Sequence, residues 1–180
     1  NLFDKIEVKK SNINKITYIG PYKPLSAKYD KDIVHKIIKL IDLESKNIQL
    51  DIKIEKNIPF KAGLGSASTN AASFVKVLEQ MKILKNVDKQ FLLNIGSDVP
   101  ACYYGKNCIV NGIGDKFYEN ILFPKYYFIL VKPDINFSTD DMYKKVKKYS
   151  ILDKQFDTNN RKFNTSKIKK KRNDFEIIAK

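Results

Sequence analysis

One segment of the chain combines glycines and hydroxyl side chains in a pattern suited to binding phosphate. It lies between an expected strand and an expected long helix, where glycines let the backbone approach an anion closely. The first amides of the helix would face that anion, reinforced by the helix dipole. The loop alone is also compatible with a turn that only caps a helix. Its residues are Pro59, Phe60, Lys61, Ala62, Gly63, Leu64, Gly65, Ser66, Ala67, Ser68 and Thr69.

Two familiar phosphate-binding patterns do not fit this loop. A Walker loop needs a Lys-Ser or Lys-Thr pair at a fixed spacing after its glycines, and the segment has none. The dinucleotide-binding pattern needs a third glycine where Ser68 stands. The hydroxyls of Ser66, Ser68 and Thr69 could instead hydrogen-bond phosphate or ligate Mg²⁺, and we expect Ser68 to be the metal ligand.

A second motif, Gly96-Ser97-Asp98-Val99-Pro100, follows about 30 residues after the loop. Gly96 ends one expected helix, and Pro100 suits the first turn of another. Asp98 therefore lies near a helix N-terminus, where a carboxylate is favoured. A fixed carboxylate can orient and deprotonate a hydroxyl that attacks the γ-phosphate of ATP. The alternative is an aspartate that caps the helix and has no further role.

Together, the two motifs resemble those of the GHMP kinases, the superfamily of galactokinase, homoserine kinase and mevalonate kinase. Within this superfamily, the chain is similar to the 4-diphosphocytidyl-2-C-methyl-D-erythritol kinases of non-mevalonate isoprenoid synthesis. The residues that carry this similarity are Gly-Leu-Gly-Ser-x-Ser-x-Asn-Ala-Ala followed by Gly-Ser-Asp-Val-Pro. The resemblance covers about residues 1–150 and is strongest over 55–115. Further matching segments are Asp32-Ile33-Val34, Asn111-Gly112-Ile113-Gly114-Asp115 and Lys132-Pro133.

This resemblance implies a site and a reaction. The loop would hold the phosphates of ATP, and Asp98 would be the catalytic base for phosphorylation of the substrate's 2-hydroxyl group. Lys56 is implied to lie near the substrate. Tyr143 falls where the family has an aromatic ring that stacks on the cytosine, although a helix aromatic packed on the core is an equal alternative. The implied cofactors are ATP and Mg²⁺, and the implied partner is the small-molecule substrate.

Two family features have no counterpart, so we expect a copy truncated at both ends. Nothing matches the Pro-x-Lys-x-Asn-Leu strand, whose lysine helps to activate the hydroxyl, or the third glycine-rich motif. Inside the loop, Lys61 replaces a small residue and Ala67 a common glycine. Loss of a positioned cation costs phosphoryl transfer about 10³–10⁵ in rate. We therefore expect this chain alone to be weakly active or inactive.

Hydrophobic periodicity predicts the elements that position these motifs. Alternating apolar residues predict strands over 2–10 and 48–54, and a continuous apolar run predicts one over 126–131. Further strands are expected over 16–19, as the partner of 2–10, and around 108–110. Helical spacing predicts helices from 30 or 31 to 43, over 66–84, over 88–95 and over 140–149. The pattern is that of an α+β protein. The resemblance implies a GHMP-kinase N-terminal domain (ribosomal S5 domain 2-like) over 1–122 and the start of an α+β C-terminal domain, with a basic tail, over 123–180.

The net charge of +14 does not by itself indicate a nucleic-acid partner. Nucleic-acid proteins concentrate Lys and Arg on one face, whereas lysine is spread along most of this chain. The densest basic run is 167–172. Cys102 and Cys108 have neither metal-site nor redox spacing, so we expect reduced thiols in a cytoplasmic protein that does not enter membranes. Two alternatives stay open: another GHMP kinase of homoserine or mevalonate type, and a degenerate, basic nucleic-acid-binding remnant.

Overall fold

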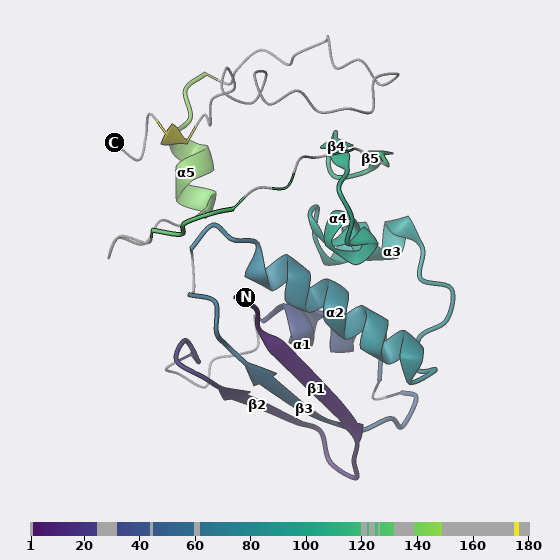
Figure 1. Ribbon diagram of the computed structural model, residues 1–180. Coiled ribbons are helices and arrows are strands. Elements are labelled where there is room, and N and C mark those ends of the chain that lie inside the picture. The colour runs from purple at the N-terminus through teal and green to yellow at the C-terminus, as the bar shows by residue number, and fades with distance from the viewer. Residues whose placement is uncertain are drawn as a thin grey trace. The chain divides into compact units, whose positions relative to one another are not determined.

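The computed structural model describes residues 2–24, 32–43, 45–59, 62–119, 122, 125, 127–131, 139–148 and 175–176 (Figure 1). The chain divides into two compact units. Unit 1 comprises Asn1–Gly105 and Val110–Phe117, and unit 2 comprises Lys106–Ile109 and Tyr118–Lys180. The segment 59–69, called the phosphate loop from here on, belongs to unit 1, as does Asp98, and Tyr143 belongs to unit 2.

A three-stranded sheet forms one layer of unit 1. Its strands are β1 (Lys5–Lys10), β2 (Lys15–Ile19) and β3 (Leu50–Glu55), in the order β1-β3-β2. β3 runs antiparallel to β1 and parallel to β2, and Ile52 is opposite both Val8 and Ile16.

The expectation that β1 and β2 pair with each other is wrong, because β3 lies between them. β3 has the most completely buried face of the three strands, with Leu50, Ile52 and Ile54 each about 1% exposed. A central position satisfies hydrogen bonds on both edges of such a strand. The turn between β1 and β2 is also bonded to the first residue of β3, since the Leu50 amide donates to Asn14 Oδ1 at 3.0 Å.

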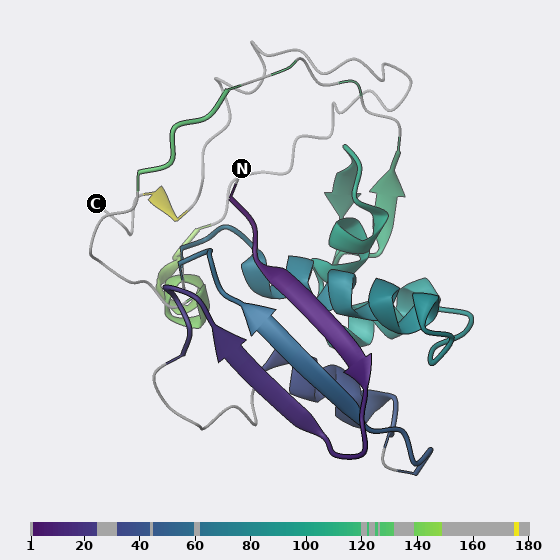
Figure 2. The same cartoon turned by 60° about the horizontal axis from the view of Figure 1, so that its bottom comes forward.

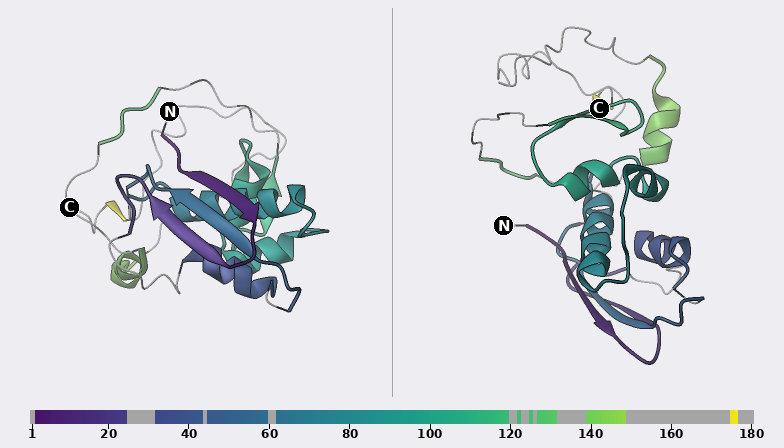
Figure 3. Two further views of the ribbon diagram at one scale, coloured as in Figure 1. Left: turned by 90° about the horizontal axis from the view of Figure 1, so that it is seen from below. Right: turned by 90° about the vertical axis from the view of Figure 1, so that its right-hand side faces the viewer.

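Helices α1 (Ile33–Leu40) and α2 (Ser66–Gln80) cover one face of this sheet, as Figures 2 and 3 show. The other face carries the alternate, polar residues of the strands, such as the exposed Lys53. The side chains between the layers are apolar and nearly inaccessible. Those at the centre are Ile37, Ile52, Ile54, Phe74, Val75 and Leu78.

Two short helices follow α2 in unit 1. α3 (Lys89–Ile95) begins at Asp88, whose carboxylate accepts a hydrogen bond from the Phe91 amide at 2.7 Å, and it ends at Gly96. α4 (Val99–Tyr104) has Pro100 in its first turn, as the sequence predicts. Strands β4 (Ile109–Asn111) and β5 (Lys116–Tyr118) then form a separate two-stranded sheet.

Unit 2 differs from the sequence prediction at its expected strand. Residues 127–131 form no strand, and their side chains are 60–93% exposed. A strand is stabilised by hydrogen bonds to neighbouring strands, and neither sheet of the described residues includes this segment. Helix α5 (Thr139–Lys145) lies close to its predicted position. No described helix is both long and apolar enough to cross a membrane.

Candidate active site

The middle of the phosphate loop depends on glycine for its backbone conformation. Gly63 and Gly65 have φ angles of +69° and +65°, in the left-handed region that side chains with a Cβ disfavour. Gly65 is also the residue from which α2 starts. A Cβ added at either glycine would meet no atom of the described residues within 4 Å. The glycines are therefore required by the dihedral angles, and space in front of the loop is open.

The first turn of α2 presents amides without a side-chain cap, since Gly65 occupies the capping position. Ser66 and Ser68 are half-buried in this turn. Thr69 is engaged locally, because its hydroxyl group donates to the carbonyl oxygens of Gly65 at 3.3 Å and Ser66 at 3.1 Å. Phe60 and Lys61, which the sequence also assigns to the loop, lie outside the described residues.

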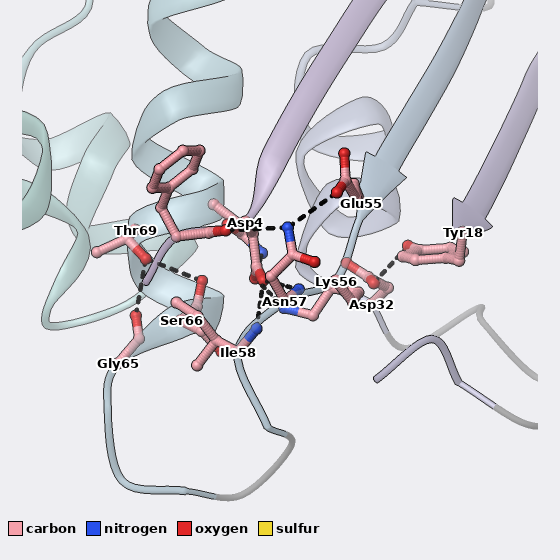
Figure 4. A network of polar contacts seen from close by, with 12 residues as sticks. Asp4, Tyr18, Asp32, Glu55, Lys56, Asn57, Ile58, Gly65, Ser66 and Thr69 are labelled. Carbon is pink, nitrogen blue, oxygen red and sulfur yellow. Dashed lines mark hydrogen bonds and ion pairs between the residues drawn. The ribbon is translucent and has the colours of Figure 1, made fainter. Parts of the chain in front are cut away.

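A buried ion pair between Lys56 and Asp4 lies where the chain leads into the loop (Figure 4). The Asp4 side chain is fully inaccessible, and that of Lys56 is 9% exposed. Asp4 also accepts hydrogen bonds from the amides of Asn57 at 2.7 Å and Ile58 at 2.8 Å. A fourth donor is the Asn70 side-chain amide, at 2.9 Å, from within α2. One carboxylate thus joins the start of β1, the entrance of the loop and the helix that follows it.

These donors decide the charge state of Asp4. Burial alone would raise the pKa of its carboxyl group, because a buried charge loses hydration. The hydrogen bonds from Lys56, Asn70, Ile58 and Asn57 outweigh that effect and hold the pKa below its ordinary value. Asp4 is therefore an anion that is paired and fully hydrogen-bonded.

Lys56, which the resemblance implies to lie near the substrate, is engaged by other residues of unit 1. Its ammonium group is engaged by Asp4, and its backbone amide donates to Ile19 O at 2.8 Å. A direct contact with substrate would require this buried pair to open, and that role stays a prediction. Asp4 and Asn70 were not identified as site residues from the sequence. An aspartate just ahead of an alternating strand carries no signal of burial.

Asp98 occupies the N-cap position of α4 and is exposed. Within the described residues its side chain makes no capping hydrogen bond, so the alternative of a pure capping role gains no support. The turn that carries it is pressed against the 111–115 turn. A Cβ at Gly114 would stand 2.9 Å from the carbonyl carbon of Ser97 and nearer still to its oxygen.

α4, which begins after Asp98, packs against α2, the helix that follows the loop. Tyr103 donates a hydrogen bond to Glu79, and the ammonium group of Lys76 lies 5.1 Å from the centre of the Tyr103 ring. The hydrogen bond to Glu79, with burial, raises the pKa of Tyr103 to about 12. These contacts lie toward the C-terminal end of α2. The approach of Asp98 to the loop at the opposite end stays a prediction.

Tyr143 lies in α5 of unit 2 and is 55% exposed. Its ring contacts that of Phe175 edge to face, with centroids 4.9 Å apart and planes at 83°. Such an exposed ring is available to a base, yet it already has an aromatic neighbour. Both interpretations made from the sequence, stacking on cytosine and packing, stay open.

The residues present fit a nucleotide phosphate. Uncapped amides at the positive end of α2, two left-handed glycines and open space form a cradle for an anion. No group of three or more His, Cys, Asp and Glu side chains that could hold a metal ion gathers among the described residues. The assignment of Ser68 as a Mg²⁺ ligand stays a prediction.

Comparison with known proteins identifies the class. Residues 32–115 match the family described as the GHMP kinases N terminal domain, and this part of the chain belongs to the GHMP kinases. The chain is 35% identical over 159 residues to the 4-diphosphocytidyl-2-C-methyl-D-erythritol kinase of Clostridium tetani (strain Massachusetts / E88), which covers 84% of the chain and 52% of the relative. It is 34% identical over 152 residues to the kinase of that name from Clostridium botulinum (strain Hall), covering 82% and 53%.

A solved structure supports the same fold. The crystal structure of a 4-(cytidine 5'-diphospho)-2C-methyl-D-erythritol kinase aligns with a TM-score of 0.57 and 20% identity, over 80% of this chain and 51% of that one. The predicted α+β class and GHMP-kinase N-terminal domain are confirmed. The chain spans about half the length of the curated relatives it matches.

Proposed function

We propose that this chain carries the phosphate-binding part of an ATP-dependent kinase that phosphorylates the 2-hydroxyl group of 4-diphosphocytidyl-2-C-methyl-D-erythritol. The observation that carries the proposal is the cradle of Gly63, Gly65 and the uncapped first turn of α2, on the same helix against which the Asp98-bearing α4 packs. The names of the relatives support the substrate. A cytoplasmic location stays a prediction.

In the proposed reaction the chain mainly positions charged groups. The amides of the loop hold the phosphates of ATP, and Asp98 orients the substrate hydroxyl group and takes its proton. The hydroxyl oxygen forms a bond to the γ-phosphorus while the bond from that phosphorus to the bridging oxygen of ADP breaks. Phosphorylated substrate and ADP leave, and Asp98 releases its proton to solvent.

Two further groups have proposed roles. Ser68 would hold Mg²⁺, which when bound neutralises phosphate charge. Tyr143 would stack on the cytosine, an interaction typically worth about 1–3 kcal/mol per base.

Binding of ATP tests the loop assignment directly. We expect the wild-type chain to bind ATP, measured by calorimetric titration in the presence of Mg²⁺. Gly65→Ala places a Cβ at a φ of +65°, which costs roughly 1–2 kcal/mol, and should weaken ATP binding about tenfold or more. Gly105→Ala is the matched control. It adds the same strain at a φ of +68°, but at the end of α4, and should leave the affinity within about twofold.

The assignment fails if the wild-type chain binds no ATP, or if Gly65→Ala binds it as well as Gly105→Ala does. The role of Asp98 needs a separate assay, transfer of labelled phosphate to the cytidyl substrate. We expect little or no turnover from this chain alone. Any turnover that is present should vanish in Asp98→Asn while ATP binding is retained. Robust turnover that depends on Asp98 would overturn the expectation of a weak enzyme and support the chemistry.

A further inference from the structure

The centre of the phosphate loop is not held in place by packing. Gly63, Leu64 and Gly65 are exposed, and a Cβ at either glycine would find no described atom within 4 Å. A loop without packed neighbours can still be ordered if both of its ends are fixed, because fixing the ends removes most of its accessible conformations. The conformation that faces the anion must therefore depend on how those ends are anchored.

One buried side chain reaches both ends. The Asp4 carboxylate accepts the amides of Asn57 and Ile58 where the chain enters the loop. It also accepts the side-chain amide of Asn70, in the second turn of the helix that leaves the loop. Only an ionised carboxylate can accept all of these donors and the Lys56 ammonium group at once. Lys56 supplies the positive charge that offsets the free-energy cost of burying the Asp4 anion.

We propose that Asp4 is a positioning residue for the phosphate loop. Its carboxylate clamps the loop entrance at Asn57 and Ile58 to α2 at Asn70, with Lys56 as counter-ion, and so orders the amides that face the nucleotide. This inference rests on the proposed function for its effect on ATP. The effect on loop order does not depend on that function.

If the Asp4–Lys56 ion pair were purely structural, it would stabilise unit 1 without ordering the loop amides that face the nucleotide. The two cases separate at Asn70, since Asn70→Ala releases the helix end of the clamp but leaves the Asp4–Lys56 pair and both backbone hydrogen bonds intact. The matched control is Asn94→Ala, which makes the same change on α3. There the Asn94 side chain accepts an exposed hydrogen bond from Gln90, one turn earlier in the same helix.

The first experiment measures amide hydrogen exchange in the full chain without nucleotide. In Asn70→Ala the Thr69 amide, which bonds Gly65 O across the first turn of α2, should exchange about 10- to 100-fold faster, the range expected for losing a hydrogen bond to a charged group. Amides of β3 report unfolding of the whole unit and should change less than about threefold. Asn94→Ala should change neither.

The second experiment measures ATP affinity, which should fall about tenfold or more in Asn70→Ala and stay within about twofold in Asn94→Ala. If the wild-type chain binds ATP and Asn70→Ala matches it in both affinity and Thr69 exchange, the clamp is overturned while the proposed function stands. If the wild-type chain binds no ATP, the proposed function fails, and the exchange result alone decides the clamp.

Asp4→Leu with and without Lys56→Met provides a second route. Asp4→Leu alone leaves a buried ammonium group unpaired, so the chain should lose stability. Adding Lys56→Met removes that charge and should restore much of the stability. A leucine side chain still cannot accept a hydrogen bond from either end of the loop. ATP affinity and exchange at Asn57 and Ile58 should therefore stay impaired in the double variant. Recovery of both along with stability would overturn the proposal. Asp88→Leu, which makes the same change at the exposed cap of α3, is the control.

Discussion

The contact between Gly114 and Ser97 gives the sharpest prediction about the position of Asp98. Gly114 has a φ of +91°, and a Cβ there would lie 2.9 Å from the carbonyl carbon and 3.3 Å from the Cα atom of Ser97. These neighbours are backbone atoms, so they cannot rotate aside as a side chain would. Gly114→Ala must push the Ser97 backbone away, and Asp98 is the next residue.

The cost of Gly114→Ala has two parts. A left-handed dihedral angle costs an alanine about 1–2 kcal/mol, and forcing a methyl group into a filled space typically costs about 1–3 kcal/mol. We therefore expect the free energy of unfolding to fall by about 2–5 kcal/mol. Gly105→Ala shares the first part only, because its Cβ would meet nothing nearer than 3.7 Å and its φ is +68°. It should cost about 1–2 kcal/mol.

Urea denaturation of both variants and the wild-type chain measures the difference. The slope against urea concentration should be unchanged, which shows that the same surface is exposed on unfolding. The reasoning about the Ser97 contact is refuted if the two variants lose the same stability within about 0.5 kcal/mol. Any residual phosphoryl transfer should also fall more in Gly114→Ala, because misplacing a reacting group by about 1 Å can cost about 10²-fold in rate.

Three further predictions follow from side-chain hydrogen bonds. The pKa of Asp4 is lowered in the folded chain, so its contribution to stability is complete above the unfolded value near 3.8 and is lost as pH falls below it; Asp4→Asn with Lys56→Met should flatten that part of an acid titration followed by circular dichroism. The pKa of Tyr103 is raised to about 12, so its contribution to stability is complete below about pH 10 and is lost as pH rises toward 12. An ultraviolet titration of Tyr103→Phe should lack the tyrosine that ionises last in the wild-type chain. If the number of tyrosines that ionise near pH 12 is the same in both, the Glu79 contact is contradicted. Asp32 caps α1 through the Val34 amide at 2.8 Å and accepts from the Tyr18 hydroxyl, so Asp32→Ala should lower the unfolding free energy by about 0.5–2 kcal/mol, and Asp32→Asn by clearly less.

The sequence was most informative where local rules decide structure. The alternation from Ile48 to Ile54 predicted β3, and the glycines ahead of Ser66 predicted the start of α2. Asp88, Gly96 and Pro100 marked the boundaries of α3 and α4, because caps and helix breakers act within a few residues.

Long-range arrangement was not available from these rules. Alternation assigns the faces of a strand but not its neighbours, so the insertion of β3 between β1 and β2 could not be predicted. The Asp4–Lys56 pair joins residues 52 positions apart, in a chain with 34 Lys and Arg residues among which Lys56 has no distinguishing pattern. The apolar residues 127–131 satisfy the pattern of a strand, yet pairing needs a partner that a pattern cannot supply.

The same distinction bears on the departures of this loop from the family pattern. Glycine is needed where the backbone is left-handed, and the structure places that requirement at Gly63 and Gly65. Ala67, which replaces a common glycine, lies inside α2 and is exposed, so its methyl group has room. Alanine also favours the helical conformation more than glycine does. This departure therefore leaves the cradle intact and even adds helix stability at its base. A return to glycine, Ala67→Gly, should destabilise the first turn of α2 by roughly 0.5–1 kcal/mol without improving ATP binding. A gain in affinity from that change would show that backbone flexibility, and not the fixed cradle, limits the loop.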